Sequence, residues 1–244
     1  MKHKLTDIHN HSLFGVDDGA RSIEHSIEML ELSCESGAGN VILTPHCYPG
    51  LYENYAGQRL TRRFEELKAE AAAQKLPLDI HLGMEVFGCF STPEDYRQGR
   101  LCTLAGSDYL LIEFDFNGFA QQTYDILGEL VEMGVKPVVA HPERYSFVAR
   151  SPSVLYKWLD MGCLLQCNKE SINGKFGRMI QQIACDMLSD KLYSFVGSDA
   201  HGATTRTPFM KYVYEYTAEN FGEGYAYEIF CENPKKIILN DIIH

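Results

Sequence analysis

The chain alternates between short apolar runs and longer segments whose apolar residues recur every three or four positions. The short runs stand at 4–9, 40–44, 78–84, 109–112, 137–140, 163–167 and 193–196. Nearly continuous apolar runs of this length are typical of strands that are buried on both faces of a parallel sheet. The pattern therefore predicts an α/β fold built from seven strands.

The segments between the runs predict helices. The first is expected to begin after Ser22, a residue that caps helices, and to end at Gly37. Others are expected where Leu60, Phe64, Leu67 and Ala71 form one face, at 120–133, 153–161 and 176–188, and over most of 208–244, where Pro234 opens a last short helix. No low-complexity linker interrupts the series, which predicts a single domain over residues 1–244. Periodicity does not distinguish a closed barrel from an open doubly wound sheet.

Composition is that of a folded protein, with 45% hydrophobic and 23% charged residues. No apolar run approaches the ~20 residues of a membrane span, and the polar start at Met1 is unlike a signal peptide. We therefore expect a cytoplasmic protein without membrane insertion. The net charge of -11 disfavours binding to nucleic acid, which normally requires a basic face. Sequence leaves the oligomeric state open.

The eight cysteines show no Cys-x-x-Cys spacing. Most lie in apolar surroundings, where free cysteine behaves as a small hydrophobic residue, so we expect reduced core cysteines. Cys47 directly follows His46 and is the one candidate for a thiol near a functional site.

Side chains suited to metal or phosphate follow the predicted strands. They are His9 and His11, His46, Glu85, Glu113, His141, Asn168, and Asp199 with His201. In a parallel α/β barrel the carboxyl ends of the strands open on one face, so these side chains are expected to meet. His3, His25, His81 and His244 lack this context and are expected to be surface or structural residues.

The ligand types indicate the kind of metal site. His9 and His11 can face one ion only if the chain turns out of the sheet, because side chains at i and i+2 of a regular strand share a face but stand apart along it. Imidazole and carboxylate ligands suit manganese, iron or zinc. The set exceeds what one tetrahedral ion needs, which predicts two or three divalent ions and a bridging carboxylate. Arg144 and Arg206 follow two of the ligand segments, and their guanidinium groups suit capture of phosphate oxygens.

The motifs resemble the PHP superfamily, named for polymerase and histidinol phosphatase. The matching segments are Asp7-Ile8-His9-Asn10-His11, Asp17-Asp18-Gly19, Thr44-Pro45-His46, Gly83-Met84-Glu85, Ala140-His141-Pro142-Glu143-Arg144-Tyr145 and Ser198-Asp199-Ala200-His201. Over its whole length the chain is similar to bacterial metal-dependent tyrosine-protein phosphatases that regulate capsular and exopolysaccharide synthesis. The loop Val16-Asp17-Asp18-Gly19 and the ending Asn233-Pro234-Lys235-Lys236-Ile237 are features of that branch.

The resemblance implies a distorted seven-stranded (β/α)7 TIM-like barrel and a trinuclear site commonly supplied with manganese. It implies that the first ion is held by His9, His11, Glu85 and Asp199, the second by Glu85, His46 and His141, and the third with help from Asp18 and His201. Glu85 would be the bridge. The implied substrate is the phosphotyrosine-bearing tail of a bacterial tyrosine kinase.

The expected reaction is hydrolysis of a phosphomonoester by water that the ions activate, with Arg144 and Arg206 neutralising the phosphate oxygens. Glu113 is a candidate general acid. A cysteine-dependent tyrosine phosphatase is excluded, because no cysteine is followed by an arginine six positions later.

Two alternatives remain at this point. One is a small-molecule phosphatase of the same superfamily, such as one acting on histidinol phosphate. An open mouth near Tyr48, Tyr52, Tyr55, Phe87 and Phe119 would suit a peptide, whereas a lidded pocket would suit a metabolite. The other is a metal-loaded regulatory module that binds phosphotyrosine without turnover.

Overall fold

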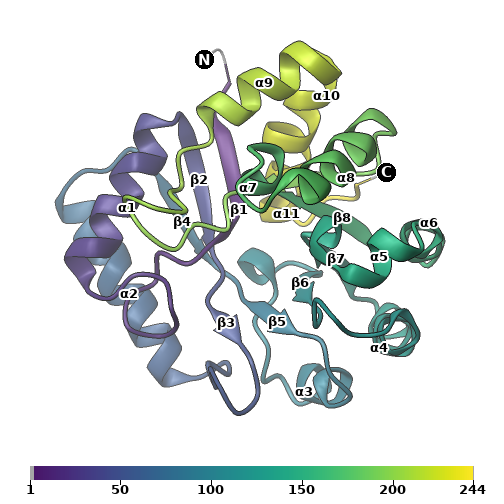
Figure 1. Ribbon diagram of the computed structural model, residues 1–244. Helices are drawn as coiled ribbons and strands as arrows, with labels where there is room; N and C mark the ends of the chain where they lie inside the picture. The colour runs from purple at the N-terminus through teal and green to yellow at the C-terminus, as the bar shows by residue number, and fades with distance from the viewer. Residues whose placement is uncertain (1–2, 244) are drawn as a thin grey trace.

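The computed structural model describes residues 3–243, in which parallel strands are surrounded by helices (Figure 1). The strands are β1 (Leu5–Asn10), β2 (Ala38–Leu43), β3 (His46–Cys47), β4 (Asp79–Leu82), β5 (Glu85–Phe87), β6 (Tyr109–Glu113), β7 (Lys136–Ala140), β8 (Leu164–Asn168) and β9 (Phe195–Gly197). The helices are α1 (Ile23–Glu35), α2 (Gln58–Ala73), α3 (Thr92–Arg97), α4 (Ala120–Glu132), α5 (Ser146–Arg150), α6 (Ser153–Asp160), α7 (Lys169–Ile172), α8 (Arg178–Ser189), α9 (Lys211–Phe221), α10 (Glu223–Tyr227) and α11 (Asn233–Leu239), with short 3-10 turns η1 (Leu104–Gly106) and η2 (Pro142–Arg144) and a π-helical segment η3 (Glu228–Glu232).

The strands form two parallel sheets, in the orders β1-β2-β4 and β3-β5-β6-β7-β8-β9. The predicted strand at 78–84 is broken at Gly83, between β4 and β5. A similar break stands at Pro45, which follows the predicted strand at 40–44 and separates β2 from β3. Proline has no backbone N–H to give to a sheet, and a Cβ at Gly83 would lie 2.9 Å from Leu104 Cδ2 and 3.0 Å from Ile42 Cγ2. Each break passes the chain from one sheet to the other and places His46 and Glu85 at the start of a new strand.

Backbone hydrogen bonds link the first strand to the segment after the last one. The Asp199 N–H donates to the His9 carbonyl at 2.8 Å, and the His11 N–H donates to the Ala200 carbonyl at 3.0 Å. The result is a mixed α/β fold with a curled parallel sheet. The predicted parallel α/β class is confirmed, while the closed seven-stranded barrel stays a prediction because the described strands divide into two sheets.

The helices cover the sheet with the faces that the apolar spacing predicts. Ser22 caps α1 by accepting a hydrogen bond from the His25 N–H, and the buried residues of α2 are Leu60, Phe64, Leu67 and Ala71. The helix expected at 176–188 begins at Arg178, and the short α7, which was not predicted, precedes it. The C-terminal part is helical as expected. Among the residues that the structure describes, no helix has the length and apolar character needed to cross a membrane.

The cysteines agree in part with the expectation of core residues. Cys47, Cys163, Cys167 and Cys231 are buried, whereas the other four are half-buried, and all eight are free thiols. Cys47 lies beside a ligand residue, but burial raises the pKa of its thiol to about 12, so it stays protonated and unreactive at neutral pH.

Candidate metal centre

His9 and His11 lie at the end of β1 and turn toward the same point. Their Nε2 atoms are 3.2 Å apart and both side chains are fully buried. The pairing of β1 with β2 is irregular between Asp7 and Asn10, so the strand departs from regular geometry where the two rings must converge. This is the local turn that the spacing of the two histidines requires.

Glu85 is the centre of the cluster. Its Oε2 lies 3.1 Å from His9 Nε2, 3.2 Å from His11 Nε2 and 3.0 Å from His46 Nδ1, and its Oε1 lies 3.0 Å from His141 Nε2. The carboxylate is 1% exposed, yet Oε2 forms no hydrogen bond with any described residue. A buried carboxylate oxygen that accepts no hydrogen bond but faces several imidazole nitrogens fits a bound cation.

Three groups of side chains have ligand atoms close enough to share an ion. They are His9, His11, Glu85 and Asp199, then His46, Glu85 and Glu113, and finally His11, Asp18, His46 and His201, with the ligand atoms of each group within 4.8 Å of one another. Each pair of groups has one residue in common, namely Glu85, His11 or His46. The groups therefore form one contiguous cluster with room for more than one ion.

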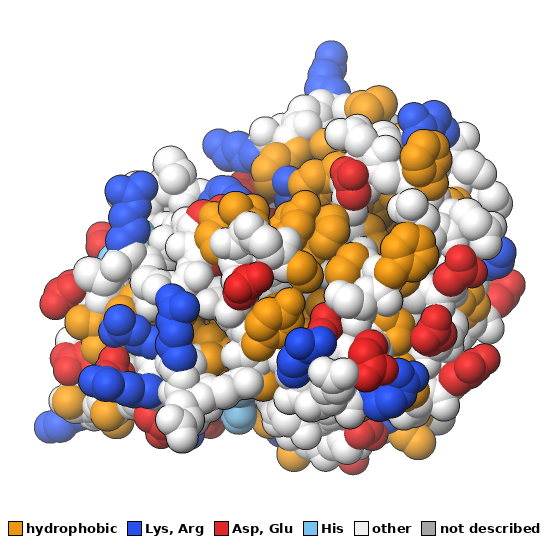
Figure 2. Space-filling model, turned by 90° about the horizontal axis from the view of Figure 1, so that it is seen from below, with side chains coloured by type: hydrophobic (Ala, Val, Ile, Leu, Met, Phe, Trp, Pro, Cys, Tyr) orange, Lys and Arg blue, Asp and Glu red, His pale blue; other side chains and the backbone are white. Residues whose placement is uncertain are grey.

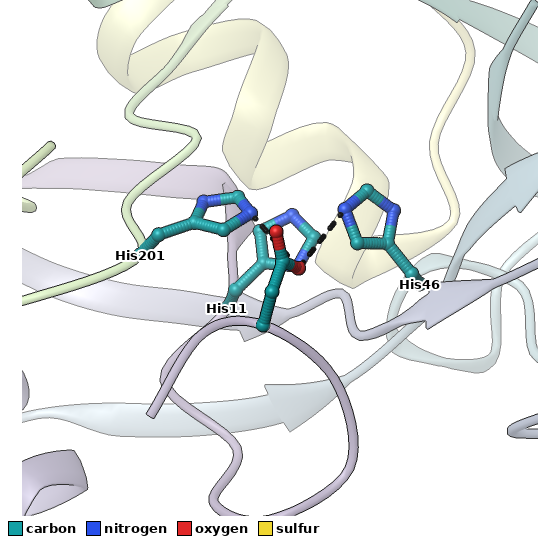
Figure 3. A group of neighbouring side chains, drawn as sticks. His11, His46 and His201 are labelled. Atoms are coloured by element: carbon teal, nitrogen blue, oxygen red, sulfur yellow. Dashed lines mark ion pairs between the residues drawn. The ribbon is translucent and has the colours of Figure 1, made fainter. Parts of the chain in front are cut away.

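The third group is shown in Figure 3, where His11, His46 and His201 point toward one another from separate segments. Asp18 Oδ1 lies 3.5 Å from His46 Nε2 and 3.5 Å from His201 Nε2. The Asp18 side chain is 49% exposed, so this end of the cluster faces the solvent.

Asp199 joins the cluster to both candidate phosphate-binding arginines. Its Oδ1 accepts a hydrogen bond from Arg206 Nη2 at 2.7 Å, and its Oδ2 lies 3.4 Å from Arg144 Nη1. Asp199, His141 and Arg206 all have positive φ angles, of 48°, 34° and 46°. Backbone strain of this kind in residues other than glycine is concentrated at functional sites.

Arg144 is held between two aromatic rings. Its guanidinium carbon lies 4.4 Å from the centroid of Phe116 and 4.3 Å from that of Phe176. Contact with both rings restricts the flat group while its N–H groups remain able to donate hydrogen bonds.

Electrostatics favour cations in the cluster. Burial alone would raise the pKa of Glu85, but the neighbouring histidines outweigh this effect and hold the pKa well below its usual range. Burial would also raise the pKa of Asp199, but His9, Arg206 and His201 lower it. Burial alone would lower the pKa of His9 and of His46, but Glu85 and the other carboxylates raise these pKa values to about 9 and about 10. Burial and the nearby Glu85 charge raise the pKa of Glu113 to about 8.

We expect metal binding to release protons. In the metal-free protein the raised pKa values of His9 and His46 keep both imidazoles protonated at pH 7, whereas a metal ligand must be neutral. Apparent metal affinity should therefore increase as the pH rises toward these values. Calorimetric titration of the chelator-treated protein with manganese, at pH 7 in buffers of different ionisation enthalpy, measures the protons released. Heats that do not depend on the buffer would contradict this expectation.

The cluster lies at the bottom of a cavity of about 280 Å³. Among the residues that line it are Tyr48 and Tyr52, and Tyr52 stacks on His46 with the ring centroids 5.7 Å apart. Two of the aromatic residues expected near the mouth, Phe87 and Phe119, line a different cavity, and Tyr55 packs against the core.

The structure brings together all eight predicted ligand residues and the three predicted catalytic residues. It also adds side chains that sequence reasoning missed. Asp17 Oδ2 lies 2.8 Å from His11 Nδ1 and accepts the His46 N–H at 2.9 Å, and Gln166 Oε1 lies 2.8 Å from His9 Nδ1. These contacts orient the ligand imidazoles. The pair of acidic residues at 17 and 18 could have indicated that Asp17 lies at the site. Gln166 stands inside an apolar strand, and nothing in the sequence around it indicates such a role.

A curled parallel α/β sheet with histidines and carboxylates gathered at one end of its strands is the arrangement of metal-dependent hydrolases. The chain belongs to the capsular polysaccharide synthesis family CpsB/CapC, whose model matches residues 5–239.

Curated relatives are similar over nearly the whole chain. The tyrosine-protein phosphatase CpsB of Streptococcus pneumoniae is 30% identical over 98% of this chain and 100% of its own length. The putative tyrosine-protein phosphatase CapC of Staphylococcus aureus is 30% identical over 98% of this chain and 93% of its own. The resemblance found from the motifs is confirmed, and the activity that it implied is the one named for these relatives.

Solved structures agree with the sequence relatives. A structure described as that of YwqE from Bacillus subtilis and CpsB from Streptococcus pneumoniae, unique metal-dependent tyrosine phosphatases, superposes with a TM-score of 0.92 at 29% identity and covers 98% of this chain and 96% of that one. Histidinol phosphate phosphatase from Lactococcus lactis has a TM-score of 0.60 at 14% identity, with coverage of 94% and 98%. The second likeness concerns the fold alone.

Proposed function

We propose that this chain is a metal-dependent protein-tyrosine phosphatase that hydrolyses phosphotyrosine on a bacterial tyrosine kinase controlling capsular or exopolysaccharide synthesis. The observation that carries the proposal is the contiguous cluster around Glu85, which lies beside two arginines in a chain of the CpsB/CapC family. We extend the proposal to a single cytoplasmic domain over residues 1–244 whose two sheets act as one distorted seven-stranded barrel.

The cluster is proposed to hold two to three divalent ions, most simply manganese, with iron and zinc also suited to these ligands. His9, His11, Glu85 and Asp199 are assigned to the first ion, Glu85, His46 and His141 to the second, and Asp18 with His201 to the third. Such ions would lower the pKa of bound water toward neutrality and would neutralise developing charge. The general-acid role expected for Glu113 stays a prediction, because this carboxylate lies in a group that can itself hold an ion.

The arginines are proposed to bind the phosphate oxygens. Arg144 and Arg206 both line the cavity, and each presents a guanidinium group beside Asp199. Their positive charge would neutralise the phosphoryl oxygens as the bond to the leaving group breaks. A tyrosine leaving group has a pKa near 10, so it needs less protonation than an alkyl alcohol. Tyr48 and Tyr52 on the cavity wall are placed to contact its ring.

The substrate class is tested by phosphate release from a phosphotyrosine peptide and from histidinol phosphate, each with manganese added. We expect the peptide to be hydrolysed with the higher kcat/KM. His141→Ala should abolish this activity because the Nε2 of His141 faces Glu85 at 3.0 Å. Faster hydrolysis of histidinol phosphate would favour a small-molecule phosphatase instead, and saturable peptide binding without phosphate release would favour a binding module.

A further inference from the structure

A second cavity lies beside the ends of β5 and β6, the strands that carry Glu85 and Glu113. It has a volume of about 180 Å³, and the rings of Phe87, Phe90, Phe114, Phe119 and Phe147 line it. Phe90 and Phe119 are 79% and 70% exposed, which is unusual for side chains of this size. Helices α3 and α4 lie at the lower edge of the molecule in Figure 1, and the face seen from below in Figure 2 shows hydrophobic side chains gathered across its centre.

Gly88 packs tightly on the ring of Phe114 in the wall of this aromatic cavity. Its backbone passes directly over the Phe114 ring, so that a Cβ at position 88 would collide with the ring, at 2.6 Å from Cδ1 and closer still to Cε1. Its N–H donates to the Glu113 carbonyl at 2.7 Å, which ties the wall of the cavity to β6. This hydrogen bond holds the segment after β5 against the end of β6, where the two segments line the cavity.

The aromatic cavity and the metal cavity share a wall. Tyr48 lines the metal cavity, Phe87 lines the aromatic cavity, and the two rings stack with centroids 3.9 Å apart at 6°. Glu113 and Phe114 are neighbours in sequence, and each lines one of the cavities. Successive side chains on an extended chain point to opposite faces. A peptide whose phosphotyrosine enters the metal cavity would cross the Tyr48–Phe87 pair to reach the second cavity.

The distance between the two cavities corresponds to a short extended peptide. The Tyr48 and Phe87 rings lie 3.9 Å apart, and a group in each cavity would contact its own ring at about 3.5–4 Å, so the two groups would lie roughly 11 Å apart. An extended chain rises about 3.3 Å per residue, so about three residues cover this distance. The volume fits one aryl ring, since an apolar cavity of about 150 Å³ is known to take benzene. Asp115 at the edge of the cavity disfavours an anion, so the ring would be an unphosphorylated one.

We propose that the aromatic cavity binds an aromatic side chain about three residues from the phosphotyrosine of the substrate, and so selects the site that is dephosphorylated. The proposal rests on the proposed function, because it places phosphotyrosine in the metal cavity. The proposed occupant is an aromatic side chain of the substrate peptide itself. Two observations support this occupant, namely the aromatic rings that line the cavity and the Tyr48–Phe87 contact that joins it to the metal cavity.

The test compares phosphotyrosine peptides that differ only three residues to either side of the phosphotyrosine, where they carry Tyr, Ala or a second phosphotyrosine. The wild-type protein should show a KM about 10-fold lower for the Tyr peptides than for the Ala peptides. The second phosphotyrosine should remove the advantage. The double variant F90A/F119A should reduce the ratio of the two KM values to about one, and neither residue is buried, so folding should be preserved.

The matched control is Tyr156→Ala, which removes a 50% exposed ring from α6 and should keep the preference. Equal KM values for the Tyr and Ala peptides in the wild-type protein would overturn the proposal, and so would a preference that persists in F90A/F119A. Hydrolysis of free phosphotyrosine distinguishes failure of this inference from failure of the proposed function. If it proceeds without any peptide preference, only this inference fails, whereas no hydrolysis of any phosphotyrosine substrate would overturn the proposed function and this inference with it.

Discussion

Replacing Glu85 by Gln is expected to lower kcat/KM for a phosphotyrosine peptide by at least about 10³-fold. The substitution keeps the size of the side chain but removes the charge that His9, His11 and His46 face at 3.0–3.2 Å. A neutral amide cannot bridge ions and leaves the buried imidazoles without their common counter-charge. Metal content should therefore fall together with activity, which elemental analysis of the purified variant measures.

The matched control is Glu94→Gln on α3, a carboxylate that is 50% exposed and forms an ion pair with Arg97 of the same helix. It should keep both metal content and activity. An E85Q protein that retains its metal and more than about a tenth of wild-type activity would show that Glu85 is not the bridge.

Replacing Arg144 by Ala is expected to lower kcat/KM by about 10²-fold or more, as the loss of a group that stabilises transition-state charge does. The guanidinium lies between Phe116 and Phe176, so its donor edge is oriented before the substrate arrives. Arg144→Lys should recover less than about a tenth of the lost activity, because an ammonium group neither stacks in the same way nor binds phosphate with two parallel hydrogen bonds. Steady-state kinetics on the phosphotyrosine peptide measure both variants, and metal content should remain normal.

Arg150→Ala serves as the control for Arg144, because Arg150 is an exposed arginine on the adjacent helix α5. It should behave as wild type. Full activity of Arg144→Lys would mean that only a positive charge is needed at this position and that the contacts with Phe116 and Phe176 have no catalytic importance.

The candidate site was accessible to sequence reasoning because of where its residues stand. Ligand-type side chains followed one apolar run after another, and the carboxyl ends of parallel strands meet on one face. His46, His141 and Asp199 could be grouped in this way without any knowledge of their distances. The helical faces, such as the one formed by Leu60, Phe64, Leu67 and Ala71, followed from spacing alone.

Features that depend on contacts between distant segments could not be predicted from the sequence. The division into two sheets depends on Gly83 fitting against Leu104 and Ile42, and nothing in the local pattern at 78–84 shows this close approach. Gln166 contacts His9 from a strand 157 positions away. The wall of the aromatic cavity includes the close packing of Gly88 on Phe114, a contact that no periodicity reveals.

If this chain hydrolyses phosphotyrosine by means of divalent ions held around Glu85, its activity must depend on bound metal. The most direct measurement is phosphate release from the phosphotyrosine peptide by the manganese-loaded protein, after treatment with a chelator, and again after manganese is restored. We expect activity to fall to the background rate on chelation and to return with the metal. Activity that survives complete removal of the metal would contradict it.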